Sequence, residues 1–425
     1  MVPHLITAQS GPINELEERI LESMPAIERW FRLEWMEHTP PFYSAVDVRN
    51  AGFKLAPMDT VLHPQAFNQL DRAMLPLAVQ AAMAAIEKIC PEAKNLLLIP
   101  EAQVRDAGYL SHLSTLVRIF RQAGLNVRLG SLDADIQSPT PLRTLEGEDL
   151  VLEPLLRQRG RLGLKDFDPC TILLNSELAG GVPQLLKHLD EQYLLPPLHA
   201  AWAVRRRSQH FRAYDELAKR FAKLLGMDPW LINPMFGQCD RVNEGDGSGL
   251  ACAQTQVDAV LSKIRRKYKD YGITERPFVV LKADDGSQRL AGVTVYDAKD
   301  LEALNLGQGA PSEMLIQEGV PTRERVDAAA AEPVVYMMDR YVVGGFYRLH
   351  AERRPDEDLN VAGARFEPLA FAQAAQLPRP GGQPGASVPN RFYMYGVVAR
   401  LAMLAASYEL EAADPEREEL EASAS

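Results

Sequence analysis

The residue types best suited to chemistry are concentrated between residues 276 and 363. Within this stretch a predicted strand ends at Lys282 and passes into a loop that contains Asp284 and Gly286. An ammonium group at the end of a strand can bind phosphate oxygens, and the amides of a glycine-containing loop can donate further hydrogen bonds to them. On these residues alone, an exposed lysine beside a β-turn is the simpler interpretation.

The next apolar strand, at residues 314–316, strengthens the case for a nucleotide site. It leads directly into Gln317, Glu318 and Val320, with a glycine and a proline in the same turn. A strand that passes into a hinge with exposed backbone amides can hydrogen-bond to the edge of an adenine. This hinge is therefore a candidate for the base-binding part of such a site.

A predicted hairpin supplies the third group of candidates. Its strands lie at residues 334–338 and 341–343, and the second strand runs on to Arg348. Glu332 precedes the hairpin and Asn360 follows it, so the three side chains could converge on one cavity. A carboxylate and an amide oxygen suit Mg²⁺, and a guanidinium group suits phosphate.

An early strand is also unusually rich in polar side chains. Tyr43, Ala45 and Asp47 are predicted on one side of it, and Val46 and Val48 on the other. A glycine shortly after the strand allows close backbone approach or an unusual φ angle. The further polar residues of this segment are Arg49, Asn50, Lys54 and Asp59.

Between these candidates, short apolar strands alternate with amphipathic helices. Strand–helix–strand order over about a hundred residues predicts an open α/β sheet with right-handed crossovers. No G-x-G-x-x-G sequence follows these strands, so a dinucleotide site is not supported. The predicted helices span residues 73–89, 110–123 and 181–189, and the predicted strands span residues 95–99, 126–129 and 171–174.

Longer helices are predicted at residues 14–37, 202–225 and 391–411. The second of them begins with a basic cluster, Arg205 to Arg207. Most of these charges fit a solvated helix face, although one or two could point into a cleft and meet an anionic ligand. The turn-rich segment Arg241–Gly249 is the predicted domain boundary, which divides the chain into a substrate-side α/β domain, residues 1–245, and a nucleotide-binding domain, residues 246–425.

The overall composition excludes several classes of protein. The 425 residues include 46 Lys and Arg against 57 Asp and Glu, a net charge of -11. This sign, without any basic block, argues against nucleic-acid binding. The four cysteines show no C-x-x-C spacing, so we expect free thiols in a reducing cytosol. We find neither a secretory signal nor an apolar stretch long enough to span a bilayer, and we predict a soluble cytoplasmic protein.

The order of these parts resembles the ATP-grasp ligases. More specifically, the wording of several segments resembles one proteobacterial family of glutamate–cysteine ligases. The resemblance covers nearly the whole chain, from Pro12 to Glu411. It rests on VDVRNAGFKLAPMDT, KIRRKYKDYGI, EPVVYMMDRYVVGGFYRLH, LNVAG and PNRFYMYGVVARL.

This resemblance implies an α/β substrate domain followed by an ATP-grasp-like domain, and the first step of glutathione synthesis. ATP would phosphorylate the glutamate γ-carboxylate, and the cysteine amine would attack the acyl phosphate. Catalysis would then consist of positioning and charge neutralisation, with Mg²⁺ as the metal. The implied roles are ATP binding by Lys282, Asp284, Gly286, Gln317, Glu318 and Val320, catalysis by Lys282 and Arg348, and metal binding by Glu332 and Asn360.

ATP-grasp ligases usually carry an acidic-x-Asn strand that binds metal after the arginine, and no good one is found after Asn360. The early polar strand could supply it, as in glutathione synthetases whose chain order is permuted. Asp47 and Asn50 then become candidate metal ligands. A salt-bridge network at the edge of the core is an equally good interpretation of this strand. The candidate contacts to substrate carboxylates are Arg49, Asn50, Lys54 and Asn68.

Two loops depart from the pattern of the family. The phosphate loop reads KADDGSQRLAG where relatives read KADAGTYGMG, and a second segment reads VLHPQAFNQL where relatives read NLFPGGFNNL. These changes keep two alternatives open: a ligase for a different acid or amine, and a non-catalytic ATP-grasp protein that binds a ligand or partner. The sequence also leaves open a homo-oligomer and whether residues 287–290 still close over phosphates.

Overall fold

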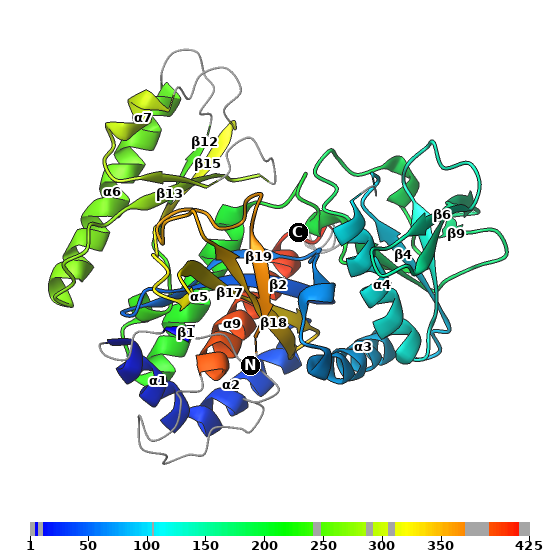
Figure 1. The fold of residues 1–425 in the computed structure, drawn as a ribbon, viewed down its shortest axis with the longest axis horizontal. Coiled ribbons are helices and arrows are strands. Elements are labelled where there is room, and N and C mark those ends of the chain that lie inside the picture. Colours follow the sequence, from blue (N-terminus) through cyan, green and yellow to red (C-terminus); the bar gives the residue numbers. More distant parts are fainter. Residues whose placement is uncertain are drawn as a thin grey trace, which may run out of the picture.

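The computed structural model describes residues 5–6, 12–103, 106–240, 248–285, 292–304, 311–369 and 391–415. These residues form a mixed α/β structure with a central sheet between two others (Figure 1). One of the two, here called the front sheet, is built from residues 95–195. The other, here called the third sheet, is smaller, is built from residues 236–318 and carries one long helix. None of the described helices is both long and apolar enough to cross a membrane.

The central sheet combines strands from both ends of the chain. Its β2 strand pairs with β17, where Asp47 lies opposite Val334, so the first long strand joins a strand from the rear of the sequence. All pairings in this sheet are antiparallel. Its strands are β1 (Leu5–Ile6), β2 (Tyr43–Asn50), β3 (Leu55–Val61), β16 (Arg325–Val326), β17 (Ala329–Met338), β18 (Tyr341–His350) and β19 (Arg365–Pro368).

The two faces of the central sheet differ as strand alternation predicts. Val46 and Val48 are buried against four helices, whereas Tyr43 and Ala45 belong to the core on the other face. The predicted alternation of this strand is therefore confirmed. The helices on the first face are α1 (Pro12–Glu22), α2 (Met24–Glu37), α5 (Arg207–Leu225) and α9 (Arg391–Ala412).

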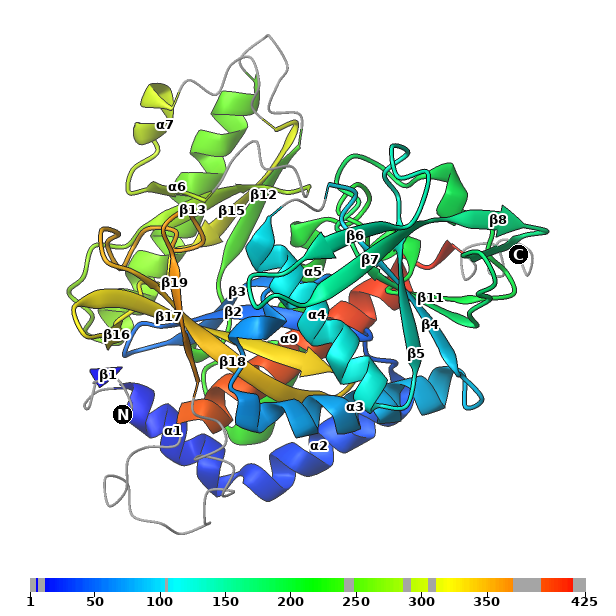
Figure 2. The same ribbon diagram turned by 45° about the vertical axis from the view of Figure 1, so that its right-hand side comes forward.

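The front sheet confirms the predicted open α/β arrangement. Its strand order is β11-β10-β4-β5-β7-β6, and every pairing except that of β6 is parallel. Helices α3 and α4 share one core with this sheet and with the central sheet, so they lie between the two (Figure 2). The elements are β4 (Asn95–Pro100), β5 (Asn126–Ser131), β6 (Thr140–Arg143), β7 (Asp149–Pro154), β10 (Thr171–Asn175), β11 (Tyr193–Leu195), α3 (Leu75–Ile89) and α4 (Ala107–Gln122).

The third sheet is antiparallel and rests on helix α6 (Ser248–Asp270). Val279 and Leu281 point toward this helix, so the alternate residues of the same strand point away from it. The tip of the β2–β3 hairpin also enters this core through Phe53. The remaining elements of this part are β12 (Phe236–Asp240), β13 (Val279–Ala283), β14 (Val293–Val295), β15 (Glu313–Glu318) and α7 (Asp300–Ala303).

Several predicted elements need correction. The single helix predicted at residues 14–37 is two helices that meet at Ser23, because Pro25 lacks the amide proton that an uninterrupted helix would need. The helix predicted at residues 181–189 is only a short 3₁₀ turn, Gln184–Leu186. The helix predicted to start at residue 202 starts at Arg207.

The cysteines also differ from expectation. Cys239 in β12 and Cys252 in α6 form a disulfide, so the prediction of free thiols is wrong for this pair. Sequence spacing did not reveal it, because packing of β12 on α6 brings the two residues together. Cys90 and Cys170 are free, with their sulfur atoms 2.6 Å apart.

The predicted domain boundary falls mostly on residues 241–247, which lie outside the described residues. The central sheet takes strands from both sides of this boundary. The division at residue 245 therefore remains a prediction, and it does not follow the edges of the sheets.

Candidate active site

The candidate site lies where the third sheet meets the central sheet. Lys282 is on the face of β13 that points away from α6, and its Nζ donates a hydrogen bond of 2.6 Å to the carbonyl of Met58 on β3. The pairing of β2 with β3 skips Met58, which makes it a β-bulge. Bulges re-aim local groups and are frequent beside active sites. Here the bulge turns a carbonyl toward the predicted phosphate-binding lysine.

Arg348 on β18 brings together two of the predicted metal ligands. It donates to Asp47 at 2.9 and 3.2 Å and to Glu332 at 2.7 Å. Glu332 lies directly opposite Arg348 in the sheet. Its second oxygen accepts a hydrogen bond of 2.8 Å from Arg49, so both Glu332 oxygens are occupied by guanidinium groups.

The charges in this cluster stabilise one another. Burial acts to lower the pKa of Arg348, but the carboxylates of Asp47 and Glu332 outweigh it and raise that pKa. Burial would raise the pKa of Glu332, but Arg49 and Arg348 hold it below its ordinary value. Asp47 is the more exposed carboxyl, and burial raises its pKa despite the attraction of Arg348. Arg348 Nε is buried and has no hydrogen-bond partner among the described residues.

Asp59 connects this cluster, through Arg207, with residues 283–285, where the predicted phosphate loop begins. It lies opposite Asp47 in the β2–β3 pair and accepts a hydrogen bond of 3.3 Å from Arg207. Burial would raise the pKa of Asp59, but the positive charges of Arg207 and Lys282 hold it well below its usual range. Burial also lowers the pKa of Lys282, and Asp59 opposes this effect.

Gln317 is an unsatisfied polar side chain inside the same region. It lies opposite Val280 on β13, on the face that carries Lys282. Its side chain is fully buried, and neither its amide nitrogen nor its oxygen has a hydrogen-bond partner among the described residues. A buried amide without partners costs free energy, so this side chain is suited to a ligand that offers both a donor and an acceptor.

Glu318 and Lys54 are also brought together, but in a buried pair. Lys54 Nζ donates to Glu318 and to the carbonyl of Asn233, each at 2.8 Å. The carboxylate of Glu318 also accepts hydrogen bonds from Trp230 Nε1 and from the amide of Met235. Both predicted ligands thus have protein partners, which matches the salt-bridge interpretation of the early strand.

Of the remaining candidates, Arg49 joins the cluster and the others lie apart from it. Asn50 is buried and donates to Glu324 and Tyr395, while the carbonyl of Val320 lies 3.5 Å from Arg49. Asn68 is half-buried in a 3₁₀ turn. Asn360 is exposed, and its backbone amide donates a hydrogen bond to the Asp358 carboxylate. Arg49 is buried and donates to Glu332 and to the carbonyls of Val320, Pro355 and Glu357.

Asp284 lies fully buried at the start of helix α5. Gly286 lies outside the described residues.

Comparisons with known proteins agree with the resemblance seen in the sequence. The sequence profile of the glutamate-cysteine ligase family (GshA) matches residues 17–410. The chain belongs to the glutamate–cysteine ligase family. A solved protein from Methylobacillus flagellatus KT, provisionally named a gamma-glutamylcysteine synthetase, is 50% identical, with a TM-score of 0.89, and the alignment covers 97% of this chain and 100% of that one.

More distant structures add little. A glutathione synthetase-like effector from Globodera pallida is 10% identical, with 84% of each chain covered and a TM-score of 0.37. A D-alanyl-alanine synthetase A from Vibrio cholerae is 12% identical, with 72% of this chain and 81% of that one covered and a TM-score of 0.32. Scores this low do not establish a shared fold. No curated protein matches the chain.

The structure of this ligase-family chain adds three residues that the sequence did not single out as site residues. Arg207 binds the carbonyls of the segment after Lys282, Asp59 accepts a hydrogen bond from Arg207, and Asp358 contributes negative charge near Lys282. Asp358 and Asn360 themselves form an acidic-x-Asn sequence on the C-terminal side of Arg348. Asp59 is one of the polar residues of the early segment and Arg207 belongs to the basic cluster, but only the fold brings the two together.

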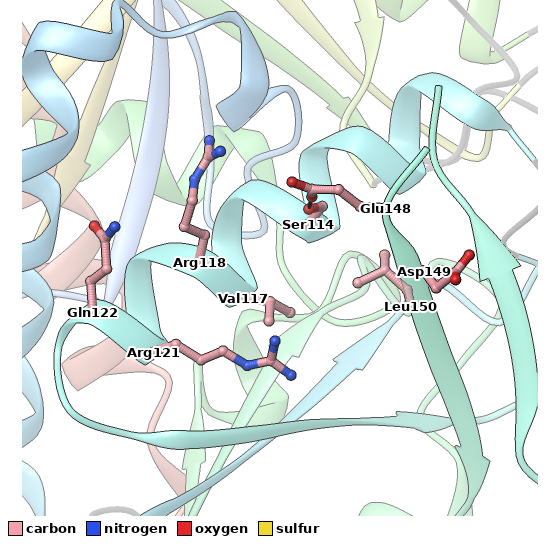
Figure 3. A pocket seen from close by; sticks show the side chains of 8 residues that line it. All are labelled: Ser114, Val117, Arg118, Arg121, Gln122, Glu148, Asp149 and Leu150. Carbon is pink, nitrogen blue, oxygen red and sulfur yellow. Dashed lines mark hydrogen bonds between the residues drawn. The ribbon is translucent and has the colours of Figure 1, made fainter. Parts of the chain in front are cut away.

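A surface hollow of about 400 Å³ lies on the front sheet, away from these groups (Figure 3). Helix α4 contributes Arg118 and Arg121 to it, and the opposite wall carries Glu148 and Asp149. The charges of the two walls balance, so the hollow has no evident preference for an anion. It contains none of the predicted site residues.

Proposed function

We propose that the protein is an ATP-dependent glutamate–cysteine ligase that forms γ-glutamylcysteine through an acyl phosphate. The observation that carries this proposal is the family match over residues 17–410, which includes every described residue of the charged cluster. The cluster supplies positive groups for phosphate oxygens and one partly exposed carboxylate, Asp47, that could bind a metal ion.

Lys282 and Arg348 are the proposed catalytic residues. The ammonium of Lys282 would exchange the Met58 carbonyl for ATP phosphate oxygens. Arg348 would direct its unpartnered Nε toward the phosphoryl group and later toward the tetrahedral oxyanion. Because Asp47 and Glu332 already fix the guanidinium plane, little reorganisation would be needed when charge develops.

The carboxylates fit Mg²⁺ in part. Mg²⁺ in nucleotide sites is held by one or two carboxylates together with substrate phosphates, so a complete protein cage is not required. No group of three or more acidic, His or Cys side chains suited to a metal occurs among the described residues. Asp47, partly exposed and bound by Arg348 alone among the side chains that the structure describes, is the best candidate ligand, and Asn360 remains a candidate from its exposed loop. When bound, Mg²⁺ would neutralise charge on the phosphates.

Glu332 suits a different role. Both of its oxygens are engaged, so in this arrangement it positions Arg49 and Arg348. Gln317 would offer its free amide to the adenine edge, and Val320 would pack beside the base. The assignment of Arg49, Asn50, Lys54 and Asn68 to substrate carboxylates remains a prediction.

A coupled ADP-release assay with ATP, Mg²⁺, glutamate and a panel of amines tests this function. We expect ADP release that requires both glutamate and cysteine. Release with another acid or amine would replace this function by that of a ligase with a different substrate. The altered VLHPQAFNQL segment favours that second candidate. No release with any pair, together with no ATP-induced thermal shift, would leave a non-catalytic protein.

Lys282→Ala tests the placement of the phosphate site in the same assay. We expect turnover to fall by on the order of 100-fold, because the site loses a charge that neutralises phosphate. Lys299→Ala is the matched control, since Lys299 is exposed in the same part of the chain. Unchanged turnover in folded Lys282→Ala protein would show that the phosphate site lies elsewhere.

A further inference from the structure

The start of helix α5 contacts the segment that follows Lys282. The helix begins at Arg207, and its N-cap residue, Arg206, provides no side-chain cap. Asp284, from a distant part of the sequence, supplies the cap instead: its carboxylate accepts from the Ser208 amide at 2.7 Å and from the Ser208 hydroxyl at 2.6 Å. A carboxylate at a helix N-terminus also interacts favourably with the helix dipole.

Arg207 holds the backbone of the same segment. Its Nη1 donates to the carbonyls of Ala283 and Asp285 at 2.9 and 2.7 Å, and its amide donates to the carbonyl of Asp284 at 2.9 Å. Three consecutive carbonyls are therefore bound by one residue. The Arg207 guanidinium also lies 4.4 Å from the Trp202 ring centre, which limits its movement.

Arg207 also connects this segment with Lys282 by a second route. Its Nε donates to Asp59, and the Asp59 carboxylate is in turn electrostatically coupled to Lys282. The three neighbouring arginines have different partners, since Arg205 binds Glu409 and Arg206 binds Glu313. Only Arg207 among them contacts the residues that follow Lys282 in the described part of the chain.

We propose that Arg207 and Ser208 are positioning residues that fix the segment 283–285, and with it Lys282, for binding of ATP phosphates. This proposal rests on the proposed function, because it assumes that Lys282 meets phosphate. The physical reason is that a displacement of about 1 Å at a reacting group can cost on the order of 100-fold in rate. Because Arg207 holds three carbonyls and the Asp59 carboxylate, it fixes the position of the Lys282 ammonium relative to the phosphates.

Four variants test the proposal: Arg207→Ala, Arg207→Lys, Ser208→Ala and the control Arg212→Ala. Arg212 lies on the same helix, is exposed and contacts Gln238. The first readout is steady-state kinetics at varied ATP and varied glutamate. We expect Arg207→Ala to raise the KM for ATP by on the order of 10-fold or more without a matching change in the KM for glutamate. Arg207→Lys should recover part of the loss, and Ser208→Ala should have a smaller effect.

The second readout does not depend on turnover. Hydrogen exchange of the peptide 279–285 should be faster in Arg207→Ala than in wild type, and unchanged in Arg212→Ala. The dissociation constant for ATP, measured by calorimetry, should rise in parallel. If wild type binds ATP but shows no ligase activity, the proposed function fails while this test remains valid.

A purely structural role for Arg207 predicts another pattern. Arg207→Ala would then lower the unfolding temperature, while the folded fraction kept wild-type exchange in residues 279–285 and wild-type affinity for ATP. That result would overturn the proposal. So would an equal rise in the KM values for ATP and glutamate in both Arg207→Ala and Arg212→Ala.

Discussion

Among single residues, Arg348 binds two carboxylates of the cluster, Asp47 and Glu332. Replacing it with alanine would remove the guanidinium that binds Asp47 and would leave Glu332 with Arg49 alone. We expect Arg348→Ala to lower kcat by on the order of 100-fold, because a preorganised group for the developing charge is lost. We also expect a loss of about 3–5 kcal/mol in the free energy of unfolding, since a buried pair is broken.

Steady-state kinetics and urea unfolding measure both effects. Arg348→Lys separates them, because a lysine keeps the charge but cannot bridge both carboxylates. It should recover more stability than kcat. A folded Arg348→Ala variant with wild-type kcat would exclude Arg348 from the reaction.

His112 makes a second residue-level prediction, through pH. Its Nδ1 accepts a hydrogen bond from the Phe67 amide, so its Nε2 must donate to Asn175, and the ring is neutral. Burial lowers the pKa of His112 to about 4. An unfolded histidine titrates near pH 6.5, as a rule of thumb, so below this pH the unfolded state binds more protons than the folded state.

The free energy of unfolding should therefore fall as the pH drops from about 6.5 to about 4, by on the order of 3 kcal/mol from this residue. Urea unfolding at several pH values measures the slope. His112→Gln should flatten it, whereas the exposed control His188→Asn should not. An unchanged slope in His112→Gln would show that other groups, such as buried His63, account for the acid sensitivity.

Among the elements, the β2–β3 hairpin shows what could and could not be predicted from the sequence. Alternation along β2 predicted the faces of Val46 and Asp47, because side-chain direction in a strand is a local property. The pairing of β2 with β17 was not predicted, because register between distant strands leaves no local signal. The same limit explains why the sequence does not predict the partner of Lys54, because Glu318 lies on a different sheet.

The Lys54–Glu318 pair gives a prediction that separates two roles. Burial lowers the pKa of Lys54 to about 8, against the attraction of Glu318. Lys54→Met should cost about 3–5 kcal/mol in the free energy of unfolding, because Glu318 keeps a buried charge without its cation. The double variant with Glu318→Gln should recover part of this loss.

Urea unfolding tests this prediction, with Lys88→Met as the control. Lys88 pairs with Asp339 but is far more exposed, so its loss should cost at most about 1 kcal/mol. If Lys54→Met instead kept its stability and raised the KM for glutamate, Lys54 would be a substrate ligand, as the sequence suggested.

The disulfide between β12 and α6 gives a prediction for the third sheet. Cys239 and Cys252 are 13 residues apart, and closing a loop of this length is worth about 3 kcal/mol in the chain-entropy account. Cys252→Ala should lower the free energy of unfolding by roughly that amount in the absence of reductant. Cys90→Ala, at a free cysteine, is the control. Equal stability of wild type with and without reductant would contradict the bond.

Across the whole molecule, the net charge of -11 contrasts with the charge of the candidate site, where cations and carboxylates are paired. Lys282, Arg348 and Arg207 each face a carboxylate before any substrate binds, so the cluster is close to neutral. ATP must therefore compete with Asp47 and Asp59 for the same cations. A divalent metal that binds Asp47 would free Arg348 for the phosphates, which gives the metal a second effect besides charge neutralisation.

The pairing of β2 with β17 also has a consequence for how the protein is made. A ribosome releases the front sheet, up to β11, long before β17 and α9 exist. At that stage the β2–β3 hairpin still lacks the strand and the helix that cover its apolar faces. Such exposed strands favour aggregation. Slow translation through the middle of the chain would thus prolong the most vulnerable stage of its synthesis.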